Sequence, residues 1–351
     1  MRKKAVVYAP HALGRDVGKT ANDLVIYSDY NPMFDVKCVV DPSKAGVDAG
    51  VAVGVGFKGV PVVESLEKAL STYKLDALIV GVAPVGGVLP RSWINDLKKA
   101  LEKGLDIYSG MHTFLSDNKE LVEAARRGGA RIYDVRKPRR EEFRIWGGDV
   151  LKCGCKRVLV AGSDCGVGKN IACIELSREL EKRGVKNTVI ATGQTMILLG
   201  FRGSVIDAIP ADFTPGVVEK YVVDACRESD VVIVEGQGAI LHPAYGQVTL
   251  AILYGVSPTD IVLCHDPSRR FRAEFSGLEL PDPSLEAKAL IQLNPNRNSR
   301  LSGVCLNTSM YELGKAREIA EEYRRVFGVP ATDPLRMGVS EIVDFILEEK
   351  L

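Results

Sequence analysis

Short apolar runs alternate with longer amphipathic segments from one end of this 351-residue chain to the other. The alternation predicts parallel β-sheets with helices on both faces, because consecutive parallel strands need a crossover between them. In the first half the expected strands are residues 5–9, 36–40, 77–81, 106–108 and 131–133, with helices over 66–70, 93–101 and 119–127. In the second half the expected strands are 157–161, 188–191, 231–235, 260–265 and 303–307, with helices over 171–183, 215–226, 285–293, 313–326 and 339–349.

The alternation breaks at residues 136–152, where a charged stretch containing Pro138 precedes Trp146-Gly-Gly-Asp. We interpret this stretch as a solvated linker with a short strand at 143–146. The expected fold class is α/β, with two doubly wound parallel-sheet domains: Rossmann-like over residues 1–147 and P-loop NTPase-like over residues 148–351. Residues 266–283 have few periodic apolar positions and are expected to form a long loop over the carboxyl edge of the second sheet.

The charge balance restricts the class of partner. Lys and Arg number 46 against 45 Asp and Glu, a net charge of +1 that favours neither nucleic acid nor an acidic membrane surface. The first apolar run stops at Pro10, too early for a signal peptide, and no run is long enough to span a membrane. We therefore expect a cytoplasmic protein that acts on a small-molecule substrate and forms a homo-oligomer.

The eight cysteines are scattered and do not suggest a disulfide framework. Several lie in apolar runs, where cysteine acts as a small buried hydrophobe. Cys153 and Cys155 are separated by one residue, a spacing that can bind zinc. Without a second such pair or neighbouring histidines, the spacing does not favour zinc over buried cysteines.

The second half carries a strand, a glycine-rich loop and a helix start that together predict a phosphate-binding site. Such a loop directs backbone N–H groups and the positive helix end at one anion, and the lysine adds a point charge. The spacing has one more residue between its outer glycines than the usual Gly-x4-Gly-Lys. The loop residues are Gly162, Ser163, Asp164, Cys165, Gly166, Val167, Gly168, Lys169 and Asn170.

Asn170 departs from the pattern, because a magnesium-binding hydroxyl is expected after the lysine. Either Ser163 or Asp164 compensates, or the loop holds phosphates without ordinary metal-assisted ATP chemistry.

Other polar residues are expected near this loop. Glu235 ends a buried strand and, with Asp207, is a candidate metal ligand. Asp212 is a candidate substrate residue or a helix cap, and Gln194 and Gln237 are candidate donors. His242 follows the Glu235 loop, and it is a candidate general base or a structural hydrogen-bonding residue.

Two resemblances follow from these motifs. Gly162-Ser-Asp-Cys-Gly-Val-Gly-Lys and Val234-Glu-Gly-Gln-Gly resemble segments of dethiobiotin synthetases, which use ATP and Mg²⁺. Ala191-Thr-Gly-Gln-Thr, Asp207-Ala-Ile-Pro-Ala-Asp-Phe-Thr-Pro-Gly and Glu235-Gly-Gln-Gly-Ala-Ile-Leu-His-Pro-Ala-Tyr-Gly resemble a bacterial and archaeal family with a Rossmann-like domain followed by a P-loop domain.

Members of that second family have been assigned as D-glutamate N-acetyltransferases, so the resemblance implies acetyl-CoA as donor. The first resemblance implies an ATP- and Mg²⁺-dependent ligase, with Lys169 on the phosphates and Asp207 and Glu235 on the metal. A nucleotide-binding protein without turnover is the third hypothesis. Asn170 favours the acetyltransferase and the binding protein without turnover over the ligase, since coenzyme A carries phosphates that need no metal-activated transfer.

The first half holds a second candidate ligand site after its first strand. Gly14, Lys19 and Thr20 lie between that strand and a helix starting at Ala21, but their spacing fits neither the Walker loop nor the dinucleotide fingerprint. Asp41 lies where a ribose-binding acid is expected, although a turn with Pro42 is the alternative. Residues 84–88 are expected to line the same crevice.

Overall fold

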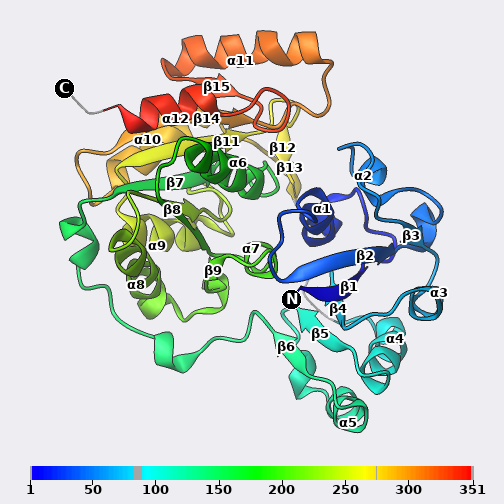
Figure 1. Ribbon diagram of the computed structural model, residues 1–351. Coiled ribbons are helices and arrows are strands. Elements are labelled where there is room, and N and C mark those ends of the chain that lie inside the picture. The colour runs from blue at the N-terminus through cyan, green and yellow to red at the C-terminus, as the bar shows by residue number, and fades with distance from the viewer. Residues whose placement is uncertain (1, 83–88, 274, 349–351) are drawn as a thin grey trace. The chain divides into compact units, whose positions relative to one another are not determined.

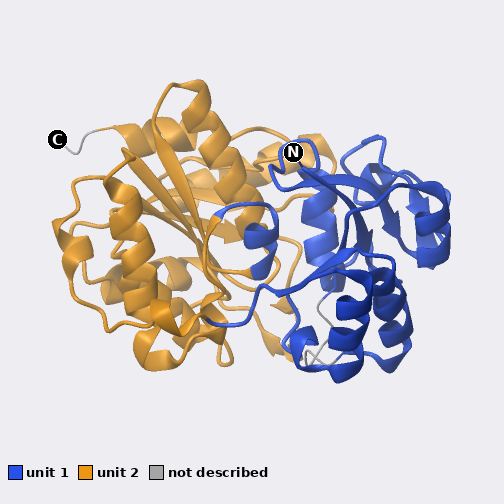
Figure 2. Cartoon of the chain, turned by 60° about the horizontal axis from the view of Figure 1, so that its bottom comes forward, with its two compact units in different colours: residues 1–138, 194–201 blue, residues 139–193, 202–351 orange. Residues whose placement is uncertain are grey.

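The computed structural model describes residues 2–82, 89–273 and 275–348. The chain forms two compact α/β units (Figure 1). Unit 1 comprises Met1–Pro138 and Gln194–Phe201, and unit 2 comprises Arg139–Gly193 and Arg202–Leu351 (Figure 2). The first change of unit therefore falls earlier than the expected boundary at 147, and one segment of the P-loop half packs in unit 1. None of the described helices has the length and apolar character of a membrane span. Residues 84–88, which were expected to line the crevice of the first domain, lie outside the described ranges.

Unit 1 contains a six-stranded parallel sheet in the order β3-β2-β1-β4-β5-β6. This order is that of dinucleotide-binding α/β domains, so the expected Rossmann-like fold is confirmed. The strands are β1 (Lys3–Tyr8), β2 (Phe34–Val40), β3 (Val62–Val63), β4 (Ala77–Val80), β5 (Asp106–Ser109) and β6 (Ile132–Asp134). The helices are α1 (Lys19–Ile26), α2 (Ala49–Ala52), α3 (Leu66–Thr72), α4 (Arg91–Glu102), α5 (Lys119–Gly128) and the inserted α7 (Gln194–Leu198).

Local sequence explains where these helices begin and end. The Asn118 side chain accepts hydrogen bonds from the amides of Glu120 and Leu121, which starts α5, and Gly129 ends it with φ of 66°. Leu97, Leu101 and Leu121 are fully buried against one face of the sheet. The apolar positions of these helices thus form the core of this unit together with the strands.

Unit 2 contains a seven-stranded parallel sheet in the order β15-β14-β11-β7-β10-β8-β9. The strands are β7 (Lys156–Gly162), β8 (Asn187–Ala191), β9 (Arg202–Gly203), β10 (Val231–Glu235), β11 (Asp260–His265), β14 (Arg300–Leu306) and β15 (Ala331–Thr332). The helices are α6 (Lys169–Lys182), α8 (Thr214–Cys226), α9 (Gly246–Val256), α10 (Pro283–Leu293), α11 (Leu313–Phe327) and α12 (Ser340–Leu347). Alternate β7 residues such as Leu159 and Ala161 pack in one core with residues of α8, α9 and α10.

Two expectations from the sequence are wrong, and one helix was not expected. Residues 143–146 form no strand. The expected loop 266–283 contains an antiparallel hairpin of β12 (Phe271–Arg272) and β13 (Phe275–Glu279), whose short strands give too weak an alternation to detect. Helix α9 was not expected, because its residues are apolar nearly all round and lack the amphipathic stripe that marks a surface helix.

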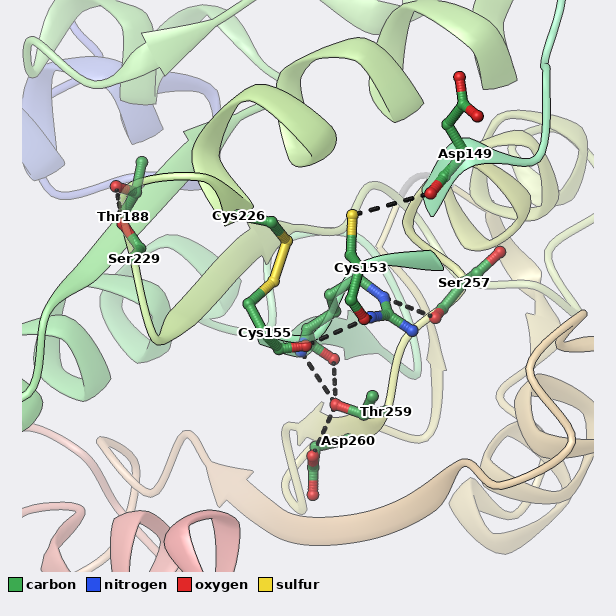
Figure 3. The surroundings of a disulfide bond; sticks show 10 residues. Asp149, Cys153, Cys155, Thr188, Cys226, Ser229, Ser257, Thr259 and Asp260 are labelled. Carbon is green, nitrogen blue, oxygen red and sulfur yellow. Dashed lines mark hydrogen bonds between the residues drawn. A yellow bond between two sulfur atoms is a disulfide. The ribbon is translucent and has the colours of Figure 1, made fainter. Parts of the chain in front are cut away.

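The cysteine interpretation is partly wrong. Cys38, Cys173, Cys264 and Cys305 are buried thiols, as expected. Cys155, however, forms a disulfide with Cys226 at the end of α8 (Figure 3). The bond joins residues separated by 71 positions, a pairing that sequence spacing does not reveal. It also takes the Cys155 sulfur away from any zinc site with Cys153.

Replacing Cys226 by serine is expected to lower the free energy of unfolding of unit 2. The bond closes a loop across a 71-residue separation, and the chain-entropy estimate for such a loop is about 4 kcal/mol. Denaturant unfolding under oxidising conditions measures the change. Cys153→Ser is the matched control, since this thiol lies outside the disulfide, and equal stability of both variants would contradict the prediction.

Candidate phosphate-binding site

The candidate site lies where β7 ends and α6 begins. Strand β7 pairs with β10 on one side and β11 on the other, so the carboxyl ends of all three strands meet at this edge. Glu235 ends β10 and His265 ends β11. A glycine-rich loop followed by a helix N-terminus at such an edge is the geometry in which α/β folds hold phosphates.

The loop backbone needs its glycines. Gly166 and Gly168 have φ of 65° and 96°, which L side chains rarely adopt. At Gly162 an added Cβ would stand 2.7 Å from the Lys169 Nζ. The Lys169 side chain is therefore folded over the start of its own loop, where Nζ donates to the carbonyl oxygens of Asp164 (2.8 Å) and Gly238 (3.1 Å). A bound phosphate would give this buried ammonium a charged acceptor in place of carbonyls.

Asp164 is the most heavily engaged residue of the loop. Its carboxylate is fully buried, and its Oδ2 accepts from the Ala273 amide (2.9 Å) and from Arg269 Nη1 (3.2 Å). The same Arg269 nitrogen also donates to the Cys165 carbonyl at 2.5 Å. On the other side, Arg272 Nη1 lies 3.5 Å and His242 Nε2 lies 3.8 Å from Asp164 Oδ1. The hairpin β12–β13 and the preceding turn thus supply the cations that surround this carboxylate.

His242 is buried, and its ring packs against Tyr245 and Phe275. Its Nδ1 accepts a hydrogen bond from the Ala244 amide at 3.1 Å. A nitrogen that accepts an N–H bond must carry a lone pair, so the neutral ring carries its proton on Nε2, the nitrogen facing Asp164.

Ser163 and His265 form a second buried pair, with 2.7 Å between Ser163 Oγ and His265 Nδ1. Burial lowers the pKa of His265 to about 4, although the neighbouring Asp266 opposes the shift. The imidazole is therefore neutral at pH 7, and its contact with Ser163 fixes the loop to the end of β11.

Asn170 is buried in the first turn of α6, at the position where the sequence lacks the expected hydroxyl. Glu235 Oε2 accepts from the amides of Thr192 (2.8 Å) and Gly193 (2.9 Å). Gln237 Nε2 donates to the Thr192 carbonyl at 2.5 Å. Glu235 and Gln237 therefore hold the turn after β8 in this structure.

Glu235, one of the two residues predicted to bind a metal, is buried. Asp207 is exposed, as is Asp212, and α8 begins without the side-chain cap proposed for Asp212. Within the described residues, the one group of three ligand-type side chains is Asp164, Cys165 and His242. Arg269 and Arg272 contact the same carboxylate, and their positive charge opposes a divalent cation there.

In unit 1, Asp41 holds the loop after β1. Its fully buried carboxylate accepts from the amides of His11 (3.0 Å), Ala12 (3.1 Å) and Leu13 (3.0 Å), and from Ser43. Burial favours a higher pKa, but these hydrogen bonds, led by that of the Ser43 hydroxyl, outweigh it and keep the pKa of Asp41 below its ordinary value. Three amides of the loop after β1 are thus occupied by an internal anion, in the loop that approaches the pyrophosphate in dinucleotide-binding domains.

The remaining candidates of unit 1 have structural partners. The Gly14 amide donates to Asn22, and Lys19 is the first residue of α1. The hydroxyls of Thr20 and Thr195 lie 2.8 Å apart, and Gln194 Oε1 accepts from Arg136 at 2.8 Å. Gln194 and Thr20 therefore take part in packing α7 into this unit.

Three further residues of the site were not predicted from the sequence. Arg269 and Arg272 lie in the segment expected to be a loop, where nothing marks an arginine that folds back onto the phosphate loop. Glu286 lies on α10, and it is buried with its carboxylate accepting from the amides of Ile240 and Leu241. Burial raises the pKa of Glu286 to about 7, against the opposing effect of those two amides. Nothing in the sequence around Glu286 distinguishes it from an ordinary acidic residue of an amphipathic helix.

The fold and this loop define a two-domain α/β protein with a Rossmann-like unit and a P-loop unit. Residues 42–138 match the Rossmann-like domain, and residues 144–343 the P-loop domain, of DUF1611, both described as domains of unknown function. The chain belongs to the DUF1611 family. The resemblance to a two-domain family read from the motifs is thereby confirmed.

Curated relatives and a solved structure agree with this membership. The chain is similar to a D-glutamate N-acetyltransferase of Tritonibacter scottomollicae, with 35% identity over 76% of this chain and 80% of that protein. It is also similar to a D-glutamate N-acetyltransferase of a Pseudoalteromonas species, with 33% identity over 84% of this chain and 86% of that protein. A crystal structure of a DUF1611 family protein from Anabaena variabilis superposes with a TM-score of 0.92 at 28% identity, covering 99% of this chain and 100% of that one.

Asp41→Asn is expected to destabilise unit 1 by about 1–3 kcal/mol, since a neutral amide is a weaker acceptor for the buried amides of His11, Ala12 and Leu13. The folded pKa is depressed, so the contribution of Asp41 is present above its unfolded value of 3.8 and is lost as pH falls through the lower folded value. Denaturant unfolding at several pH values measures both effects. Asp35→Asn is the control, because its carboxylate pairs with Lys37 on the surface, and a similar loss in both variants would argue against the anchoring role.

Glu286→Gln is expected to flatten the pH dependence of the stability of unit 2. The folded pKa is raised from 4.5 to about 7, so the folded state binds more protons in this window and wild-type stability falls as pH rises through it. Thermal unfolding across that range gives the slope. The exposed Glu279, which pairs with Arg270, provides the control variant Glu279→Gln, which should retain the wild-type slope. An unchanged slope in Glu286→Gln would exclude the proposed titration.

Proposed function

We propose that this protein is an N-acetyltransferase that transfers the acetyl group of acetyl-CoA to the amino group of D-glutamate or a related amino acid. The observation that carries the proposal is the similarity to two D-glutamate N-acetyltransferases, at 33% and 35% identity, over three quarters or more of the chain. A cytoplasmic location, expected from the sequence, is part of this proposal because acetyl-CoA is the proposed donor.

The chemistry of the P-loop supports a coenzyme A ligand. Coenzyme A ends in a phosphorylated ADP, whose phosphates suit the loop from Gly162 to Asn170 and the buried ammonium of Lys169. ATP-dependent phosphoryl transfer in P-loop proteins uses a hydroxyl after the lysine to hold Mg²⁺. Asn170 replaces that hydroxyl, so the loop retains the groups that bind phosphate and lacks one that serves metal-assisted transfer.

The transfer itself makes two demands on the protein. The acceptor nitrogen must lose a proton before it attacks the thioester carbon, and the carbonyl oxygen gains negative charge as that nitrogen adds to the carbon. His242 presents Nε2–H as a donor for such an oxygen, and Gln237 Nε2 is a second donor beside the same loop. The thiolate of the departing coenzyme A takes up the proton that the amine loses. Both residues remain candidates for contact with the reacting atoms.

The test is release of free coenzyme A from acetyl-CoA by the purified protein, followed with a thiol reagent. D-Glutamate is expected to support release, and L-glutamate and D-aspartate measure selectivity. Lys169→Ala should raise the KM for acetyl-CoA about tenfold or more, because a buried charged donor to phosphate is lost. Lys182→Ala, at the exposed end of the same helix, is the matched control.

Absence of coenzyme A release with every amino acid tested would refute the proposal. Release of ADP from ATP with Mg²⁺, dependent on Lys169, would instead support the ligase hypothesis.

A further inference from the structure

Two buried polar atoms face each other beside the phosphate loop without a hydrogen bond. Within the described part of the chain, neither Asp164 Oδ1 nor Arg272 Nη1 has a hydrogen-bond partner, although each exposes less than 1 Å². They lie 3.5 Å apart, too far for a good hydrogen bond, in side chains that are 0% and 2% exposed. A buried charged atom that lacks a hydrogen bond is costly even within an ion pair, so these two atoms are candidates to bind a ligand.

The rest of each side chain is already fixed. Asp164 Oδ2 accepts from the Ala273 amide and from Arg269, while Arg272 Nη2 donates to the Leu241 carbonyl at 2.9 Å. These bonds direct the two remaining atoms toward one place. His242 Nε2, which carries the ring proton, lies 3.8 Å from the same Asp164 oxygen.

The chemistry of the two atoms specifies the ligand. The carboxylate oxygen requires a donor and is best served by a cation, whereas the guanidinium nitrogen requires an acceptor and is best served by an anion. An α-amino acid carries an ammonium and a carboxylate on one carbon, so it presents both groups side by side. A metal ion would satisfy only the oxygen and would be repelled by Arg269 and Arg272.

We propose that Asp164 and Arg272 form the binding site for the acceptor amino acid, with Asp164 Oδ1 on its ammonium and Arg272 Nη1 on its α-carboxylate. His242 Nε2–H lies beside the bound ammonium, where the acetyl group arrives. The assignment rests on the proposed acetyl transfer for the identity of the ligand. Because both atoms are buried here, the Asp164 and Arg272 side chains must separate to admit the amino acid between them.

Calorimetric titration of the intact protein with D-glutamate, without acetyl-CoA, tests the assignment. Arg272→Gln and Asp164→Asn should each weaken binding about tenfold or more, since each removes a charged partner of the ligand. Arg270→Gln is the matched control, because Arg270 lies on the same hairpin, is exposed and pairs with Glu279. It should bind D-glutamate as the wild type does.

Two analogues separate the roles of the two residues. Glutarate lacks the ammonium, so Asp164→Asn should not weaken its binding further, whereas Arg272→Gln should. 4-Aminobutyrate lacks the α-carboxylate, so its binding should be insensitive to Arg272→Gln. Titration with acetyl-CoA should give a Kd for Arg272→Gln within about twofold of the wild type, a change too small for loss of a charged contact.

Failure of the wild type to bind D-glutamate, or equal binding by both variants, would overturn the assignment. Loss of acetyl-CoA affinity in Arg272→Gln with unchanged D-glutamate affinity would also overturn it, since the arginine would then serve the phosphates. Binding with the expected pattern but without coenzyme A release would support the site and refute the acetyl transfer, so the two failures are distinguishable.

Discussion

A single buried carboxylate, that of Asp164, organises the candidate phosphate-binding edge of unit 2. A P-loop collects backbone amides to attract an anion, and here one of its own residues is an anion. The free energy cost of burying that charge is partly offset by Arg269, by the Ala273 amide and by the proximity of Arg272. Both arginines lie in the segment after β11, so their ion pairs with Asp164 hold that segment against the loop. Removing it would leave the guanidinium groups of Arg269 and Arg272 without their shared carboxylate.

The sequence predicted the larger elements of both sheets because their physical signals are local. Runs such as Val231–Glu235 are apolar on both faces, and stretches such as Leu313–Phe327 carry a helical stripe, so each shows its structure within a few residues. The hairpin of β12 and β13 and the disulfide between Cys155 and Cys226 depend on contacts between distant segments. No local periodicity encodes them.

The same distinction applies to the candidate site. The loop from Gly162 to Lys169 was predictable, because its chemistry lies in consecutive residues. The partners of Asp164 were not, since Arg269, Arg272 and His242 reach it from two other segments. In unit 1 the strand order suggests a dinucleotide domain, yet Asp41 supplies an anion from within the chain. Fold and strand position alone would have assigned this acid to a ribose.

The segment Gln194–Phe201 gives the chain an unusual connectivity. It leaves unit 2 after Gly193, whose amide is held by Glu235, packs α7 in unit 1 through Thr195 and Gln194, and returns at Arg202. The polypeptide therefore changes unit three times. Neither unit is a contiguous stretch of sequence that could be exchanged with another protein by a single recombination, because a cut near residue 138 would strip α7 from unit 1. The two units are therefore expected to be inherited together as one chain.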